Sequence, residues 1–208
     1  MQIDFWFDPA CPWCWLTSRW LNLVAPERDL EVTWRPISLF FKNEPKPADR
    51  LYEPTLWSRN LLRVVEAVRQ AGHEDRIGDL YTRFGTHIHH EGRVEFHVGD
   101  DLEALGLDVA LAAAMDDDSF DRPIRKSMDE GLTLTGQDVG TPLIAFDDAD
   151  GERVGLFGPV ISQVPTGPAA VEAWDAFVTL ARTRGFWETK RGRNEDPNFD
   201  SVPAELLA

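Results

Sequence analysis

The pattern of apolar positions at the start of the chain is typical of a strand, then of a helix, and then of a second strand. A short apolar run at 2–7 predicts a buried strand, and the stretch from 11 to about 25 reads as a helix that Pro26 stops. Residues 30–35 alternate apolar and polar side chains, which predicts a second strand. Because strand, helix and strand follow in that order, we expect a parallel pair joined by a crossover.

The middle of the chain has a different pattern. Residues 42–50 contain prolines and charges and read as a linker, and from about 54 to 135 apolar residues recur at spacings of three and four, as from Ile77 to Ile88. This stretch is expected to be entirely helical. Two strands at 143–146 and 154–157, joined by a hairpin turn, and an amphipathic helix at 168–184 complete the expected elements.

The composition of the chain says more about its possible binding partners than about its fold. A chain of 208 residues with a net charge of −15 can bury one sizeable core, and its acidity argues against nucleic acids and anionic membranes as partners. No apolar run approaches the roughly 20 residues of a membrane span. The first residues include Asp4 and Asp8 and lack the pattern of a signal peptide, so we expect a cytoplasmic protein.

The candidate chemistry lies at the first strand-to-helix junction. Cys11-Pro12-Trp13-Cys14 holds both cysteines of the chain, and this spacing at a helix start is typical of a redox dithiol. The N–H groups of the first helical turn favour a thiolate at Cys11, so Cys11 is expected to be the exposed, low-pKa attacking thiol. Cys14, one turn further in, would resolve the mixed disulfide. The dipeptide Pro12-Trp13 between the cysteines is expected to tune the reduction potential of the pair.

Several segments together resemble the DsbA-like family, and within it most closely the mycothiol-dependent nitroreductases and oxidoreductases. The segments lie at 5–15, 17–20, 88–92, 125–127, 138–142 and 157–160. The resemblance implies an α/β fold with a thioredoxin-like core, β-α-β then β-β-α, interrupted by a large all-helical insertion. We expect the core at 1–50 and 137–190, the insertion subdomain at 51–136, and a polar, loosely ordered C-terminal tail at 191–208.

The same resemblance implies further site residues. It places a cis-proline, Pro142 after Thr141, against the dithiol, where backbone groups could pair with a bound thiol. It also brings the segment containing His89 near the site. Asn43 and Tyr52 align with family positions near the substrate pocket, and Trp13 would offer an apolar platform for a flat substrate. These residues would shape the site around the two catalytic cysteines.

The expected function is a thiol-disulfide oxidoreductase without a tightly bound cofactor or metal. The resemblance implies that mycothiol supplies the electrons, and that disulfides or nitro-aromatic compounds accept them by a purely dithiol mechanism. Its partners would therefore be small molecules, and a homodimer is compatible with the sequence.

Three alternatives remain open. A general protein-disulfide reductase or isomerase would use thioredoxin or glutathione as its partner. A glutathione-dependent isomerase like the kappa-class transferases normally has serine in place of the first cysteine, so Cys11 counts against it. A non-catalytic metal-binding module would complete a zinc site with His87, His89 or His90, although no second C-x-x-C is present.

Overall fold

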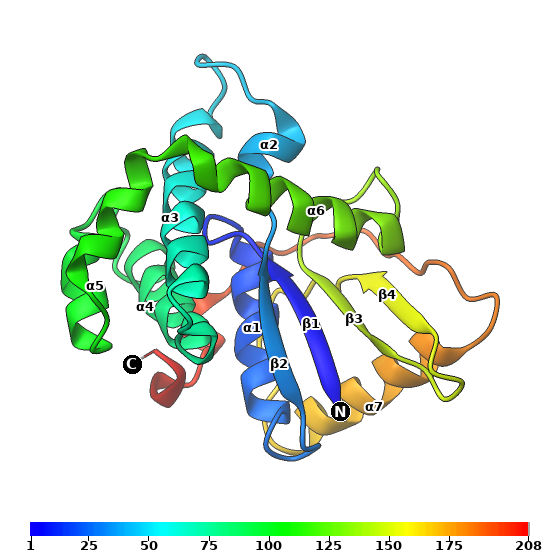
Figure 1. The fold of residues 1–208 in the computed structure, drawn as a ribbon. Helices are drawn as coiled ribbons and strands as arrows, with labels where there is room; N and C mark the ends of the chain where they lie inside the picture. Colours follow the sequence, from blue (N-terminus) through cyan, green and yellow to red (C-terminus); the bar gives the residue numbers. More distant parts are fainter. Residues whose placement is uncertain (208) are drawn as a thin grey trace.

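One four-stranded sheet organises the molecule (Figure 1). The computed structural model describes residues 1–207. The sheet has the strand order β2-β1-β3-β4, in which β1 pairs with β2 in parallel, and β3 runs antiparallel to both β1 and β4. The strands are β1 (Gln2–Phe7), β2 (Glu31–Pro36), β3 (Leu143–Asp147) and β4 (Arg153–Phe157). The parallel pair and the later hairpin are confirmed, and the fold is the expected thioredoxin-like α/β class.

Two helices, α1 (Pro12–Val24) and α7 (Pro168–Arg182), pack together on one face of the sheet. The Trp20 indole nitrogen donates to the Ala170 carbonyl at 2.9 Å, and the rings of Trp20 and Trp174 lie 5.8 Å apart. Both tryptophans are buried. Burial of side chains of this size supplies a large share of the hydrophobic free energy of folding.

Helix α6 (Asp121–Thr135) covers the opposite face, and this differs from the prediction that all of 51–136 forms an insertion. The Trp6 indole nitrogen donates to the Ser127 carbonyl at 2.7 Å. At Gly131 a Cβ would lie 2.9 Å from Leu143 and 3.0 Å from Trp6, so the absence of a side chain lets the helix approach the strands. Helix α6 therefore belongs to the core layers.

The remaining helices of the middle region form a layer beside the sheet. They are α2 (Leu39–Asn43), α3 (Tyr52–Gln70), η1 (Glu74–Arg76), α4 (Ile77–His89), α5 (Val98–Ala104), η2 (Val109–Asp116) and η3 (Asp118–Phe120). Where a linker was expected, α2 occupies its first residues. Tyr81 of α4 stacks on Phe7 of β1 at 4.2 Å, so this layer packs directly on the end of β1 that leads to the dithiol.

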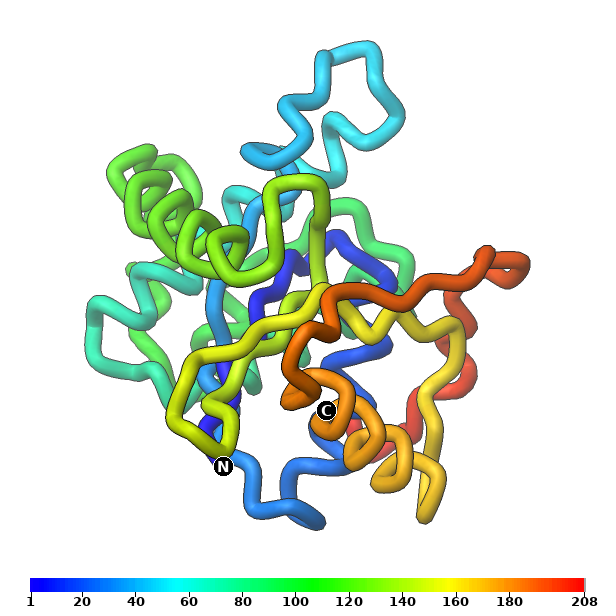
Figure 2. The backbone as a smooth tube through the Cα atoms, turned by 90° about the vertical axis from the view of Figure 1, so that its right-hand side faces the viewer, coloured from blue at the N-terminus to red at the C-terminus, as the bar shows by residue number. Residues whose placement is uncertain are grey.

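The end of the chain also differs from its prediction. Instead of a loosely ordered tail, the chain after α7 crosses the molecule and ends in two short helices, η4 (Phe199–Ser201) and η5 (Ala204–Leu206), against α1 and α4 (Figure 2). Val202 is buried, and the Leu206 carbonyl accepts a hydrogen bond from the Arg19 guanidinium at 3.0 Å. Apolar residues scattered among charges were enough to attach the segment.

Candidate active site

The dithiol lies where β1 ends and α1 begins. Cys11 is the N-cap residue of α1, with its sulfur 3.4 Å from the Cys14 backbone nitrogen that donates to it, and Pro12 occupies the first helical position. Proline is favoured there because its φ suits a helix and the missing N–H would have no intrahelical acceptor. Both cysteines are free thiols in this structure. The local sequence thus forms the helix start that was predicted for it.

The segment before β3 faces the two sulfurs. The peptide bond between Thr141 and Pro142 is cis, as predicted, and so is a second one at Gly158–Pro159. The Cys11 thiol donates to the Thr141 carbonyl at 3.6 Å. The Thr141 hydroxyl oxygen lies 3.2 Å from the Cys14 sulfur and 2.9 Å from the Trp6 carbonyl oxygen. Thr141 therefore contacts both thiols, one through its backbone and one through its side chain.

The predicted ionisation of the dithiol is wrong for the state seen here. Cys11 is more exposed than Cys14, but only 6% against 0%. Burial raises the pKa of the Cys11 thiol, and the neighbouring Cys14 raises it further, while the N–H groups of Cys14 and Trp13 lower it. Burial also raises the pKa of the Cys14 thiol to about 12, against the lowering by the Thr141 hydroxyl. Loss of hydration outweighs the helix start, so both thiols are neutral.

A buried carboxylate that the sequence reading did not single out organises the loop before Cys11. Asp8 accepts hydrogen bonds from the backbone nitrogens of Ala10 at 2.8 Å and Leu39 at 2.7 Å, and from the Ser58 hydroxyl. Burial raises its pKa to about 6, although these three hydrogen bonds lower it. Asp8 thus ties the dithiol loop to α2 and α3. Its place directly before the Cys-x-x-C segment was the only available signal.

His89 holds the same loop from the other side. Its Nε2 donates to the Pro9 carbonyl at 2.9 Å, and its ring stacks between Trp15 at 5.8 Å and Phe199 at 5.3 Å. Burial lowers the pKa of His89 to about 4, so the ring is neutral at pH 7. The neighbouring His90 accepts from the Trp15 indole nitrogen at 3.0 Å. His89 therefore contacts the dithiol loop through Nε2. Its other ring nitrogen, Nδ1, takes no part in that contact.

A buried arginine beneath the site was also missed. The Arg19 guanidinium lies 4.1 Å from the Trp15 ring centroid and donates to the Thr82 hydroxyl at 2.8 Å. Its second terminal nitrogen, Nη2, and the Tyr81 hydroxyl are buried without a partner among the described residues. Burial lowers the pKa of Arg19 to about 10. A charged side chain between the tryptophans of a mostly apolar helix could have marked it.

Two of the expected pocket residues lie on α2 and α3. Asn43 is exposed at the end of α2, and Tyr52, half-buried at the start of α3, meets Phe40 with ring centroids 5.7 Å apart. Neither has a hydrogen bond to the dithiol among residues 1–207. The residues suggested for a zinc site are also separated: His87 pairs with Glu91 and Asp101. In the described part of the chain, no group of three or more His, Cys, Asp or Glu side chains is arranged to hold a metal ion.

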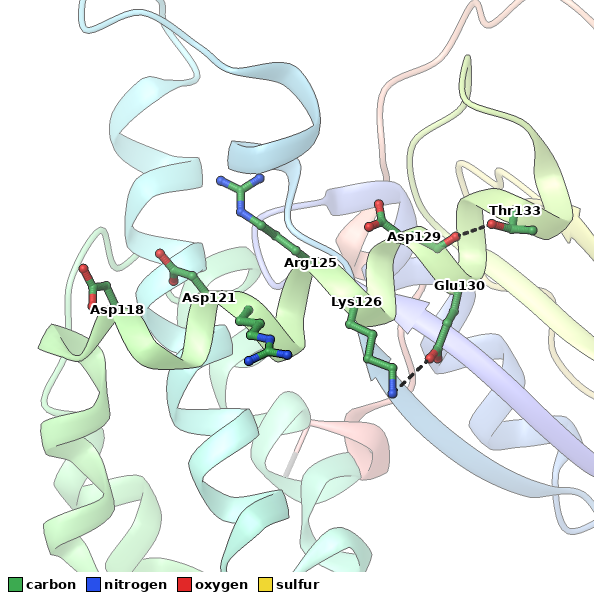
Figure 3. A pocket seen from close by; sticks show the side chains of 8 residues that line it. Asp118, Asp121, Arg125, Lys126, Asp129, Glu130 and Thr133 are labelled. Carbon is green, nitrogen blue, oxygen red and sulfur yellow. Dashed lines mark hydrogen bonds and ion pairs between the residues drawn. The ribbon is translucent and has the colours of Figure 1, made fainter.

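A pocket of about 710 Å³ lies on the outer side of η3 and α6, and no residue of the dithiol motif lines it (Figure 3). Its lining side chains are mainly charged, and Lys126 pairs with Glu130 at 3.8 Å. Arg125 turns toward α2, with its guanidinium 3.7 Å from the ring centroid of Phe41. The sulfurs lie elsewhere, so we assign the chemistry to the dithiol and not to this open charged surface.

Comparison with known proteins supports the same chemistry. A family model for the mycothiol-dependent nitroreductase Rv2466c, of the Rv2466c-like family, matches residues 10–191. The chain is 28% identical over 201 residues to the uncharacterized protein Rv2286c of Mycobacterium tuberculosis, covering 92% of this chain and 82% of that protein.

Solved structures share the fold. The cytosolic disulfide reductase DsbM from Pseudomonas aeruginosa superposes with a TM-score of 0.56 at 18% identity, over 86% of this chain and 97% of that one. The probable DsbA oxidoreductase SCO1869 from Streptomyces coelicolor gives a TM-score of 0.56 at 18% identity, over 98% of each chain. Among residues 1–207, no helix has both the length and the apolar character needed to cross a membrane.

Proposed function

The chain belongs to the Rv2466c-like family of mycothiol-dependent nitroreductases and is a thiol-disulfide oxidoreductase of the DsbA-like type. We propose that Cys11 and Cys14 are its redox centre and that mycothiol is its electron donor. The observation that carries the proposal is the arrangement of the two sulfurs. Cys11 caps α1 and faces the Thr141 carbonyl, and Cys14 lies completely buried behind it. A substrate would reach Cys11 first.

In the oxidative half of the cycle, the Cys11 thiolate attacks one sulfur of a substrate disulfide and releases the other half as a thiol. Cys14 then attacks the Cys11 sulfur, which releases the second thiol and leaves the Cys11–Cys14 disulfide. Two mycothiol molecules reverse this change. The first forms a mixed disulfide on Cys11 and frees Cys14. The second attacks the sulfur of the bound mycothiol, which frees the Cys11 thiol and releases oxidised mycothiol. Each cycle moves two electrons, and the thiol protons exchange with water.

The buried, neutral thiols imply an opening step before the attack. Ser58 of α3 and His89 of α4 both hold the loop that leads to Cys11, through Asp8, Ala10 and Pro9. We infer that the helical layer moves as a lid and restores water to Cys11, which lowers the pKa of its thiol. Forming the Cys11–Cys14 bond changes the packing beneath that layer, so its position would depend on the redox state.

Reduction of nitro-aromatic compounds would use the same electron pair. The dithiol becomes the disulfide while the nitro group takes up two electrons and two protons to give a nitroso group and water. Trp13, half-buried beside Cys11, would stack the flat ring of such a substrate. We place the reaction in the cytoplasm, where a disulfide of this kind is transient and catalytic.

The donor can be tested directly. Oxidised protein is mixed with mycothiol or with reduced thioredoxin and its reductase, and the free protein thiols are counted over time. Fast reduction by mycothiol and slow reduction by thioredoxin supports the proposal. The opposite order would assign the protein to general protein-disulfide reduction instead.

A further inference from the structure

A cationic segment of the chain leads from the end of α7 to a contact with Trp13 of the dithiol motif. Residues 182–193 carry five Arg or Lys and one Glu, in a protein whose net charge is −15. This segment follows α7 and leads to η4, and Figure 2 shows it crossing the molecule in orange to red. The charge of the segment is therefore opposite to that of the rest of the protein.

The segment meets the active site through one residue. The guanidinium carbon of Arg193 lies 5.2 Å from the ring centroid of Trp13, the residue directly before Cys14. A cation above an aromatic face is attracted by the electron density of the ring, which favours this position for the guanidinium. Arg193 remains exposed to solvent, so its N–H groups that do not face the ring can bind a ligand.

The positive charge is not neutralised by neighbouring carboxylates. Within residues 1–207, Arg193 forms no ion pair, and neither do Arg184, Lys190 and Arg191. The nearest acidic residue in sequence, Glu195, accepts a hydrogen bond from the Ser162 hydroxyl at 3.1 Å.

Hydrogen bonds after Arg193 attach the segment next to the site. The Asn198 backbone nitrogen donates to the Ser162 carbonyl at 2.8 Å, and the Val164 nitrogen donates to the Ser201 hydroxyl at 2.9 Å. Phe199 then stacks on His89, which holds the dithiol loop. The position of Arg193 is thus restrained from the C-terminal side by contacts with the loop that follows β4 and with α4.

We propose that Arg193 is a specificity-determining residue, which selects electron acceptors that carry a carboxylate or similar anionic group beside the reactive disulfide or aromatic ring. The ring of Trp13 would contact the flat part of the acceptor, and the guanidinium would bind its anionic group with two parallel hydrogen bonds. This inference rests on the proposed function, because it assumes that the acceptor reacts at Cys11.

Three disulfide probes of different charge test the inference on the reduced full-length protein. They are 5,5′-dithiobis(2-nitrobenzoate), a dianion, 4,4′-dithiodipyridine, which is neutral at pH 8, and cystamine, a dication. Second-order rate constants are measured for the wild type and for Arg193→Gln, and each probe is compared with itself. Differences in the intrinsic reactivity of the probes then cancel.

We expect Arg193→Gln to lower the rate constant for the dianion by about two- to fivefold, which is the range of an exposed ion pair. The rate constant for the neutral probe should not change. Arg193→Glu should slow the dianion more and accelerate cystamine. Arg193→Lys should recover part of the rate with the dianion, and added salt should remove the difference between the variants. Arg191→Gln removes the same charge two residues away and serves as the matched control, with a smaller effect.

The experiment distinguishes failure of the specificity role from failure of the proposed function. Equal changes for all three probes in Arg193→Gln, or an equal effect of Arg191→Gln, would overturn the specificity role and leave the dithiol chemistry intact. A wild-type protein whose Cys11 reacts with none of the probes would instead overturn the proposed function. Circular dichroism of each variant checks that the fold is retained.

Discussion

The replacement of His89 by glutamine should change how the stability of the protein depends on pH. His89 is half-buried, and its loss of hydration lowers its pKa from 6.5 to about 4 in the folded protein. The unfolded chain therefore binds a proton between pH 6.5 and 4 that the folded protein does not bind. The free energy of unfolding must then fall as the pH is lowered through this window.

The magnitude follows from the difference in pKa. A shift of about 2.5 units corresponds to about 3 kcal/mol of stability that is present at pH 7 and lost at pH 4. Glutamine can place its amide nitrogen where the histidine Nε2 donates to the Pro9 carbonyl, but it does not titrate. It also loses the ring stacking with Trp15 and Phe199, which costs about 1 kcal/mol at every pH.

The two effects predict a crossing of the stability curves. His89→Gln should be about 1 kcal/mol less stable than the wild type at pH 7 and about 2 kcal/mol more stable at pH 4. Asp8, with its pKa raised to about 6, makes the folded protein lose stability as pH rises from 3.8 to 6, but this contribution is common to both proteins and cancels in the comparison.

Urea denaturation followed by tryptophan fluorescence at pH 4, 5, 6 and 7 measures the difference. The exposed His73→Gln controls for removal of a histidine elsewhere on the surface. A stability difference between His89→Gln and the wild type that stays constant across these pH values would refute a neutral His89 with a lowered pKa.

Three further predictions concern the packing and motion of the site. Gly85→Ala would place its Cβ 2.2 Å from the Trp15 ring, and we expect a loss of about 3 kcal/mol in urea denaturation, while Gly192→Ala, with open space around it, should be neutral. Thr141→Val removes the hydroxyl beside the Cys14 sulfur, and it should cost about 1 kcal/mol of stability and slow resolution of the Cys11 mixed disulfide. Thr141→Ser should retain the stability and the rate of resolution. Equal values for the two variants would contradict a role for the hydroxyl. Hydrogen exchange of oxidised and reduced protein should differ in α3 to α5. Equal protection in both states would show that this layer does not move with the redox state.

Local pattern was enough to predict the elements that carry the site. The strand before Cys11, the helix after it and the hairpin of β3 and β4 follow from short-range periodicity and from the positions of prolines. Helix α6 was assigned to the wrong layer because its apolar face, which includes Ile124, Met128 and Leu132, would suit either a sheet or another helix. Periodicity shows that a face is buried and does not show against what.

The properties of the sulfurs could not be predicted in this way, because they depend on contacts distant in sequence. Cys11 is buried beside the segment before β3, after a loop that residues of α3 and α4 hold. The resulting loss of water raises its pKa, against the expected direction. The C-terminal segment was expected to be loosely ordered because its residues are mostly polar. A few contacts, such as those of Phe199 and Val202, decide its position instead.

The most direct test of the central claim is to trap the mixed disulfide. Reduced Cys14→Ser and Cys11→Ser proteins are mixed with oxidised mycothiol and examined by intact mass and peptide mapping. We predict one mycothiol adduct, on Cys11, in Cys14→Ser, and a far slower reaction in Cys11→Ser, because Cys14 is completely buried. An adduct that forms faster on Cys14, or no adduct on either protein, would contradict Cys11 as the attacking thiol of a mycothiol-dependent enzyme.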